Sequence, residues 1–221
     1  MENKKFITKL KNEYLGRTYA FACGLFIIIL TLSIIFFIFT KGIATFTKDG
    51  VSLAEFLFST VWKPEGSPKS FGALIFIAGS TLVSVGAVIL SAPISVALAI
   101  FMHYISPKFG SKVLQPALEL FVGIPSVVYG WLGFSILLPM LKAGFGGIGF
   151  SLLAGIIVLS VMILPTIASI SADAVKVVPA NYMEASYGLG ATRWQTISRV
   201  IVPAAKGGIL TGVVLGLARA F

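Results

Sequence analysis

Long apolar runs separated by short polar segments are the feature that most constrains how this chain folds. They cover approximately residues 19–40, 71–102, 114–141, 150–171 and 204–221. A helix needs about 20 predominantly apolar residues to cross the hydrocarbon core of a bilayer, and each run reaches or approaches this length. The chain is 57% hydrophobic and only 11% charged, values far outside those of soluble domains. We therefore predict an all-α, polytopic transmembrane helical bundle with about five spans.

Helix-breaking residues interrupt three of the predicted spans. Pro93 lies in the second span, Pro165 in the fourth, and Gly123 and Pro125 in the third. A bilayer tolerates interrupted backbone hydrogen bonding only where neighbouring protein or a water-filled cavity satisfies the freed groups. The break at Gly123 and Pro125 is therefore a candidate part of a pathway through the membrane. Tyr129 follows closely and is a candidate for lining it, although aromatic packing or interface anchoring is the commoner role.

The distribution of basic residues predicts how the chain is oriented. With the N-terminus in the cytoplasm, eleven lysines and arginines lie in inside segments and five in outside segments. Cytoplasmic segments carry the excess of lysine and arginine in membrane proteins, so this orientation is favoured. It makes residues 1–18 a basic cytoplasmic N-terminus and 19–221 a transmembrane domain, with an external loop at 41–70 and a cytoplasmic loop at 172–203. It also accounts for the net charge of +9 without a nucleic-acid partner.

Several kinds of chemistry find no support in this sequence. It contains no G-x-x-x-x-G-K-[ST] phosphate-binding loop, so we do not expect the chain to hydrolyse ATP itself. One histidine and one cysteine leave no cluster that would hold a metal or activate a nucleophile. No A-x-A-like site follows the first apolar run, so we expect an uncleaved span rather than a signal peptide. The prediction is a membrane protein that is not an enzyme and binds no metal.

The predicted cytoplasmic loop has the pattern of two short helices joined by glycines. Pro179 suits the first turn of a helix, where its missing N–H would have no partner in any case. Gly188 and Gly190 can take the left-handed conformation that ends this helix. The T-x-x-Q sequence at 192–195 is a capping box that starts a second helix, and Pro203 is expected to interrupt that helix at the membrane edge. We call the segment 179–203 the bracket, and we expect it to present a short rigid ridge outside the lipid.

Arg219 is a second candidate site because it lies within the last apolar run. An ionised side chain at membrane depth costs about 2.5–3.5 kcal/mol on insertion scales and usually faces a cavity or a partner. An anionic substrate is one candidate partner. The alternative is that the span ends at Phe221 and that Arg219 extends to the nearby interface.

The bracket also carries the spacing of a known motif: Glu-Ala-small, three residues, glycine, nine residues, aliphatic, any residue, aliphatic, proline. The residues that match are Glu184, Ala185, Ser186, Gly190, Val200, Val202 and Pro203. This pattern resembles the EAA loop in the permeases of bacterial ABC importers. The resemblance implies that the loop docks into a groove on a separate ATPase subunit, with small residues at 185 and 186 allowing close approach. Considered alone, Glu184 would be explained by the favourable dipole near a helix N-terminus.

Other segments resemble the PstC-type permease of the high-affinity phosphate importer. They are 71–85, 119–130, 191–197 and 210–221, together with Trp62 and Pro64. The resemblance implies phosphate transport across the bacterial plasma membrane, with no cofactor in this chain. It implies a heterodimer with a second permease, two ATPase subunits that bind ATP and magnesium, and an extracytoplasmic phosphate-binding protein. Permeases of this type have six spans and continue past the position of Phe221, so we expect the sixth span to be missing here.

Two other functions stay open. A permease for sulfate, molybdate or another small solute would share the EAA-like loop, because nothing in the charge pattern separates phosphate from other oxyanions. A channel or structural membrane subunit that is not coupled to ATP would show no association with an ATPase, and it would tolerate changes at Glu184 and Gly190.

Overall fold

The computed structural model describes residues 2–47, 50–66 and 70–221, with side chains from Gly16 onward. Lys48 and Lys69, which the charge count assigns to the outside, lie beyond these residues, as do the basic side chains before Gly16. Five helices in the described part are long and apolar enough to cross a membrane. The predicted all-α polytopic bundle with about five spans is therefore confirmed. The chain divides into two compact units, Met1–Ile75 and Phe76–Phe221, which are described separately below.

The first unit contains a long helix, a short helix and a small hairpin. Its elements are α1 (Glu2–Thr47), α2 (Leu53–Phe58), β1 (Trp62–Lys63) and β2 (Ser70–Phe71). The strands pair antiparallel, with Trp62 opposite Phe71. The two rings lie edge to face, with their centroids 5.8 Å apart. Helix α1 is continuous through both the expected polar N-terminus and the first span, because lysine, glutamate, leucine and arginine are all good helix formers. The described segment of α1 that is long and apolar enough to span is Gly16–Thr47, which contains the predicted 19–40.

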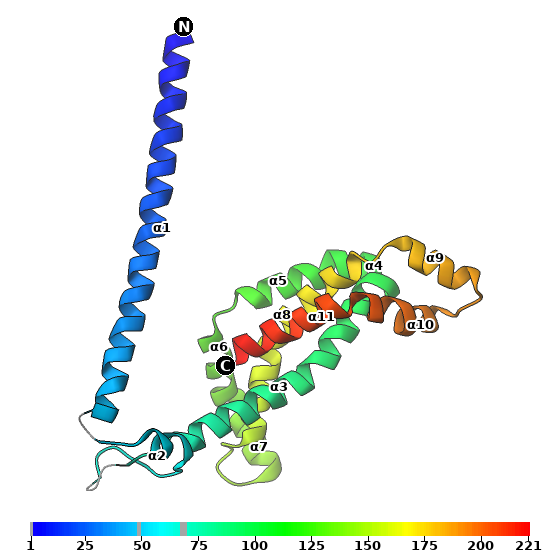
Figure 1. The fold of residues 1–221 in the computed structure, drawn as a ribbon. Helices are drawn as coiled ribbons and strands as arrows, with labels where there is room; N and C mark the ends of the chain where they lie inside the picture. The colour runs from blue at the N-terminus through cyan, green and yellow to red at the C-terminus, as the bar shows by residue number, and fades with distance from the viewer. Residues whose placement is uncertain (1, 48–49, 67–69) are drawn as a thin grey trace. The chain divides into compact units, whose positions relative to one another are not determined.

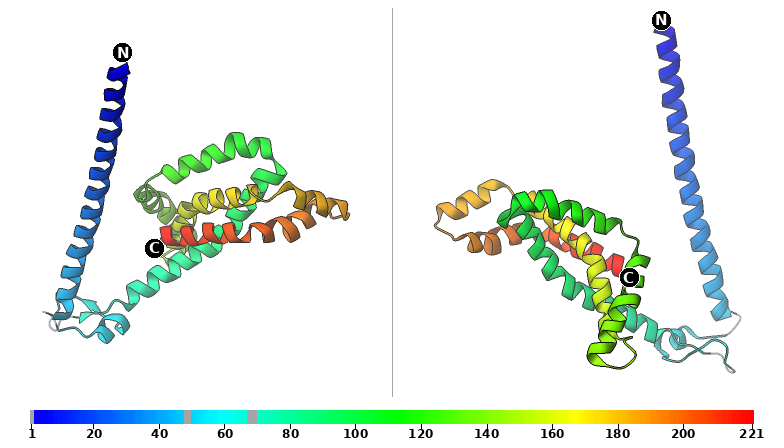
Figure 2. Two further views of the ribbon diagram at one scale, coloured as in Figure 1. Left: turned by 45° about the horizontal axis from the view of Figure 1, so that its top comes forward. Right: turned by 180° about the vertical axis from the view of Figure 1, so that it is seen from behind.

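The second unit is a bundle of helices (Figure 1). Most of α3 (Leu74–Ile100) belongs to it, and the other helices are α4 (Pro107–Phe109), α5 (Gln115–Gly123), α6 (Ser126–Leu132), α7 (Leu138–Phe145), α8 (Leu152–Lys176), α9 (Ala180–Gly188), α10 (Arg193–Thr196) and α11 (Val202–Ala220). Four π-helical turns join some of them: Phe101–Ile105, Gly110–Leu114, Gly133–Leu137 and Ile197–Ile201. Helices α9 and α10 extend beyond the others at one end, whereas the chain ends at the opposite end of α11 (Figure 2).

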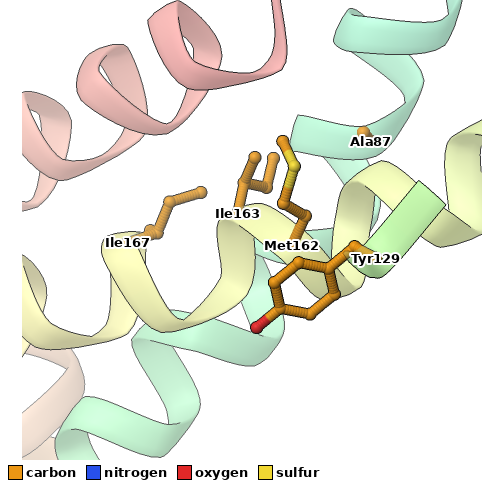
Figure 3. Packing of buried hydrophobic residues seen from close by; sticks show 5 residues of the cluster. All are labelled: Ala87, Tyr129, Met162, Ile163 and Ile167. Carbon is orange, nitrogen blue, oxygen red and sulfur yellow. The ribbon is translucent and has the colours of Figure 1, made fainter. Parts of the chain in front are cut away.

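The core of this unit lies around α8. Figure 3 shows one buried cluster, in which Ile163, Ile167 and Met162 of α8 gather with Ala87 of α3 and Tyr129 of α6. A second cluster joins α3, α5 and α8, and a third joins the end of α8 to the start of α11. Helix α8 therefore holds the bundle together, and α11, which carries Arg219, packs against it.

The predicted break at Gly123 and Pro125 is confirmed. Helix α5 ends at Gly123, Ile124 and Pro125 are extended with ψ of 126° and 138°, and α6 begins at Ser126. The predicted single span at 114–141 is wrong in its limits, because the break divides it and the span-length helix is 126–145. The carbonyl of Phe121 accepts from the hydroxyl of Tyr129 at 2.9 Å and from the N–H of Ile124 at 3.3 Å, so it is satisfied at the break.

The predicted interruption at Pro203 is wrong. A π-helical turn at Ile197–Ile201 leads directly into α11, and the whole segment 193–220 is one span-length helix. In this turn the N–H of Val202 donates to the carbonyl of Ile197, five residues earlier. A proline in a regular helix lacks an N–H and meets the carbonyl four residues before it. The wider turn lets the helix continue past Pro203 into the membrane.

Close approach between α8 and α11 gives a test of the packing. A Cβ at Gly208 would overlap the Cβ of Ala174, and neither atom can rotate away because each is bonded to backbone. We expect Gly208→Ala to destabilise the bundle by about 1–3 kcal/mol. Gly207→Ala is the matched control, since nothing lies within 4 Å of a Cβ there and alanine favours the helix by about 1 kcal/mol. Thermal unfolding in detergent measures the melting temperature of each full-chain variant. Equal melting temperatures for Gly208→Ala and Gly207→Ala would contradict the close packing of α8 and α11.

Candidate functional site

The first helix of the bracket ends at Gly190 by a defined hydrogen-bond pattern. Pro179 occupies the N-cap position of α9, one residue before the first turn that is predicted for it, with φ of −61° and ψ of 138°. At the other end, Gly190 has φ of +80°, its N–H donates to the carbonyl of Tyr187 at 2.9 Å, and the N–H of Ala191 donates to that of Ser186 at 3.1 Å. This is a Schellman motif, which satisfies the last carbonyls of a helix.

The two glycines of the bracket therefore have different roles. The prediction of a left-handed residue is confirmed for Gly190 but wrong for Gly188, which is the last residue of α9 and keeps a right-handed conformation. One left-handed residue is enough to turn the chain, so the other glycine has no such requirement.

The second helix of the bracket starts at the predicted capping box. The hydroxyl of Thr192 accepts a hydrogen bond from the N–H of Gln195 at 3.3 Å. In return, the side-chain oxygen of Gln195 accepts from the N–H of Thr192 at 2.8 Å. Two N–H groups at the start of α10 are thereby satisfied, and the prediction is confirmed.

Ser186 holds the two helices of the bracket against each other. Its hydroxyl lies 2.9 Å from that of Thr196 in α10, and both residues are buried. Ser186 therefore faces α10, and the expectation that it offers a small surface to an external partner is corrected. Its small size instead lets α9 approach α10. Glu184 and Ala185, by contrast, are exposed and free to meet a partner.

The exposed side of the bracket also carries large apolar side chains that the sequence analysis did not single out. Leu189 is 89% exposed and Trp194 69%, and Tyr182 and Tyr187 are also exposed. Exposed apolar and aromatic residues on a polar segment favour contact with another protein. The sequence contained a signal, namely apolar residues between charged ones, but a tryptophan beside a membrane is usually explained as an interface anchor.

The second candidate site lies near the other end of α11, at Arg219. Its Nη1 donates to the hydroxyl of Thr166 in α8 at 2.7 Å. Its Nη2 donates to the carbonyl of Val122 at 3.2 Å, in the last turn of α5 before the break. The structure thus brings Arg219 beside the break at Gly123 and Pro125.

The charge of Arg219 is not neutralised by these contacts. Both acceptors are neutral, and the side chain forms no ion pair within the described residues. A guanidinium carries five N–H donors, so some remain for a further acceptor. An oxyanion is the ligand whose charge and geometry suit such a group best.

Tyr129 belongs to the wall of this region rather than to its polar part. The residue is only 6% exposed, its ring packs in the cluster shown in Figure 3, and its hydroxyl is already bonded to Phe121. An apolar cavity of about 330 Å³ adjoins it, lined by residues such as Ile124, Met140 and Val161. Such a lining offers no hydrogen bonds to an anion, so the polar contacts of Arg219 are the better candidate for binding one.

Comparisons with known proteins cover both candidate sites. Residues 95–221, which contain the bracket and Arg219, match the family described as "Binding-protein-dependent transport system inner membrane component". The chain is 52% identical over 211 residues to the "Probable ABC transporter permease protein YqgH" of Bacillus subtilis, covering 95% of this chain and 68% of that protein. It is 34% identical over 191 residues to the "Phosphate transport system permease protein PstC" of Pasteurella multocida, covering 76% and 60%.

A more distant relative covers a similar part of the chain. The identity is 28% over 231 residues to the "Phosphate transport system permease protein PstC 2" of Mycobacterium tuberculosis, covering 95% of this chain and 70% of that protein. The chain thus spans about three-fifths to seven-tenths of the length of these relatives. All are named as permeases, in agreement with the prediction of a transport subunit rather than an enzyme.

Proposed function

This chain belongs to the family of binding-protein-dependent transport system inner membrane components, and we propose that it is a permease subunit of an ATP-driven importer of inorganic phosphate. The family and the five apolar helices make it a multi-pass membrane protein. In the proposed orientation the N-terminus and residues 172–203 lie in the cytoplasm and 41–70 outside, in a bacterial plasma membrane. The excess of basic residues in the inside segments supports this orientation.

The observation that carries the proposal is the geometry of the bracket. A Schellman motif at Gly190, a capping box at Thr192 and the contact between Ser186 and Thr196 fix two short helices as one rigid element. This element leaves Glu184 exposed, together with Leu189 and nearby aromatic side chains. A rigid helical ridge of this kind fits a groove on a partner protein. We assign it to docking on an ATPase subunit.

The partners follow from this assignment. A second permease subunit would complete a heterodimer, and two ATPase subunits would bind ATP and magnesium, so this chain itself needs no cofactor. An extracytoplasmic phosphate-binding protein would deliver the substrate. Membrane lipids would surround the apolar surface of the bundle, and no nucleic acid is involved.

In the proposed mechanism, closure of the ATPase subunits moves the bracket and changes which side of the membrane the bundle opens to. Rigid-body movement of helices around a fixed site is the usual basis of alternating access. Arg219 would offer phosphate a charge-assisted contact beside the break at Gly123 and Pro125. Phosphate is negatively charged and has several oxygens that can accept hydrogen bonds from the guanidinium. Water and neutral solutes lack the complementary charge.

Two experiments test the function. The tagged chain is purified from its native membrane, and uptake of radiolabelled phosphate is measured in cells whose phosphate uptake depends on this chain. We expect a second permease and an ATPase to co-purify, and unlabelled phosphate to compete for uptake at concentrations at which sulfate and molybdate do not. Competition by sulfate or molybdate instead would assign the chain to another oxyanion. A chain that purifies without any ATPase, and tolerates changes at Glu184 and Gly190, would be a channel or a structural subunit.

A further inference from the structure

Arg193 connects the bracket to a helix that is distant in the sequence. From the first turn of α10, its Nη2 donates to the carbonyl of Tyr104, 89 residues earlier. Tyr104 belongs to the π-helical turn Phe101–Ile105, which directly follows α3. Apart from this bond, Arg193 is exposed. The contact therefore joins α10, the second helix of the bracket, to the C-terminal end of α3.

The chemistry of a helix end explains why an arginine is suited to this position. The last carbonyls of a helix have no N–H donors further along the same helix. Here the next residues are Ser106 and Pro107, and a proline has no N–H to give. The C-terminal end of a helix also carries the negative pole of the helix dipole, which favours a cation. Arg193 supplies both a donor and a positive charge at that point.

Tyr104 is itself held by the core of the bundle. Its hydroxyl lies 3.4 Å from the carbonyl of Val175 near the end of α8, to which it donates. Its ring packs against the buried cluster that contains Val175 and Ile201, and Met183 of α9 packs against the same cluster. The end of α3, the end of α8 and the base of the bracket therefore meet at one place.

Helix α3 also makes a hydrogen bond to the neighbourhood of Arg219. The hydroxyl of Ser84 donates to the carbonyl of Ala220, the next residue after Arg219, at 3.1 Å. Further along α3, the hydroxyl of Ser95 donates to the carbonyl of Leu164 in α8 at 3.1 Å. Between Ser84 and Tyr104 the helix covers about 30 Å at 1.5 Å per residue. Helix α3 thus contacts the segment that carries Arg219 at Ser84, and the π-helical turn that follows its C-terminal end contacts the bracket.

We propose that Arg193 is a positioning residue that ties the bracket to the C-terminal end of α3, so that a displacement of the bracket also displaces α3. Arg193 touches no substrate and acts through the carbonyl of Tyr104. The inference rests on the proposed function, because it requires a partner ATPase that moves the bracket. It assigns α3 as the element through which movement of the bracket displaces the residues around Arg219.

The test uses the assembled transporter in proteoliposomes, with phosphate uptake and ATP hydrolysis measured in the same preparation. Arg193→Met removes the donors and the charge but keeps an unbranched side chain, and Arg193→Lys keeps a cation that can donate. Lys206→Met is the control, because Lys206 is an exposed basic residue of α11 that lies outside the bracket and makes no hydrogen bond within the described residues. The ratio of phosphate taken up to ATP hydrolysed is the readout that a loss of assembly alone would not change.

We expect the Arg193→Met transporter to contain normal amounts of the ATPase subunit, with its ratio of uptake to hydrolysis lowered about tenfold, the scale of one charge-assisted hydrogen bond. Arg193→Lys should recover most of the ratio and Lys206→Met should leave it unchanged. A normal ratio in Arg193→Met overturns the inference, and so does a loss of the ATPase subunit from that variant. If the unaltered chain neither assembles nor transports, the proposed function fails first and the inference fails with it.

Discussion

Phosphate uptake by the Arg219→Gln variant is expected to fall about 10- to 100-fold, while co-purification with the partner subunits stays normal. The glutamine can still donate one hydrogen bond, but it has no charge. In the unaltered chain the guanidinium is held by Thr166 and Val122, which are neutral and leave its charge available. Initial rates of radiolabelled phosphate uptake, normalised to the amount of assembled transporter, measure the effect.

Three further variants separate the role of Arg219 from general effects of charge and packing. Arg219→Lys should recover part of the uptake, since it keeps the charge but not the fork of N–H donors. Thr166→Val removes the hydroxyl with little change of shape and should lower uptake less than Arg219→Gln does. Lys206→Gln removes an exposed charge near the other end of α11 and should have no effect. Normal uptake in Arg219→Gln would mean that Arg219 serves only to hold α5 and α8 together.

The features that sequence reasoning predicted correctly are those set by local chemistry. Five spans follow from apolar length, the break follows from Gly123 and Pro125, and the capping box follows from Thr192 and Gln195. Each of these depends on residues within a few positions of one another. Their physical cause can therefore be read directly from the sequence.

The features that it missed depend on neighbours distant in the chain. Arg219 reaches Thr166 and Val122, 53 and 97 positions away, and no periodicity indicates such partners. Ser186 matches a motif by its size, but only the packing of α9 against α10 shows that it faces inward. The π-helical turn before Pro203 is a local exception: it accommodates a proline that a regular helix could not accept, so the sequence suggested a stop where the helix continues.

The second large effect is expected at Gly190, whose φ of +80° is in the left-handed region. Gly190→Val places a β-branched residue there and costs about 1–3 kcal/mol, so the turn between α9 and α10 should change its shape. We expect uptake of phosphate per ATP hydrolysed to fall at least about tenfold. Gly188→Val is the control of equal size two residues earlier, because that glycine is helical and a Cβ there meets nothing within 4 Å.

Removing the side chain of Glu184 tests the same surface without changing the backbone. Glu184 is exposed, so Glu184→Ala should leave the fold intact and reduce coupling only if the glutamate meets a partner. The two variants thus act by different means, one through the shape of the turn and one through a contact outside the chain. If both retain full coupling of ATP hydrolysis to phosphate uptake, the bracket is not the docking element. If Gly190→Val is defective and Glu184→Ala is normal, docking depends on the shape of the ridge and its apolar residues, with Leu189 and Trp194 as the next positions to change.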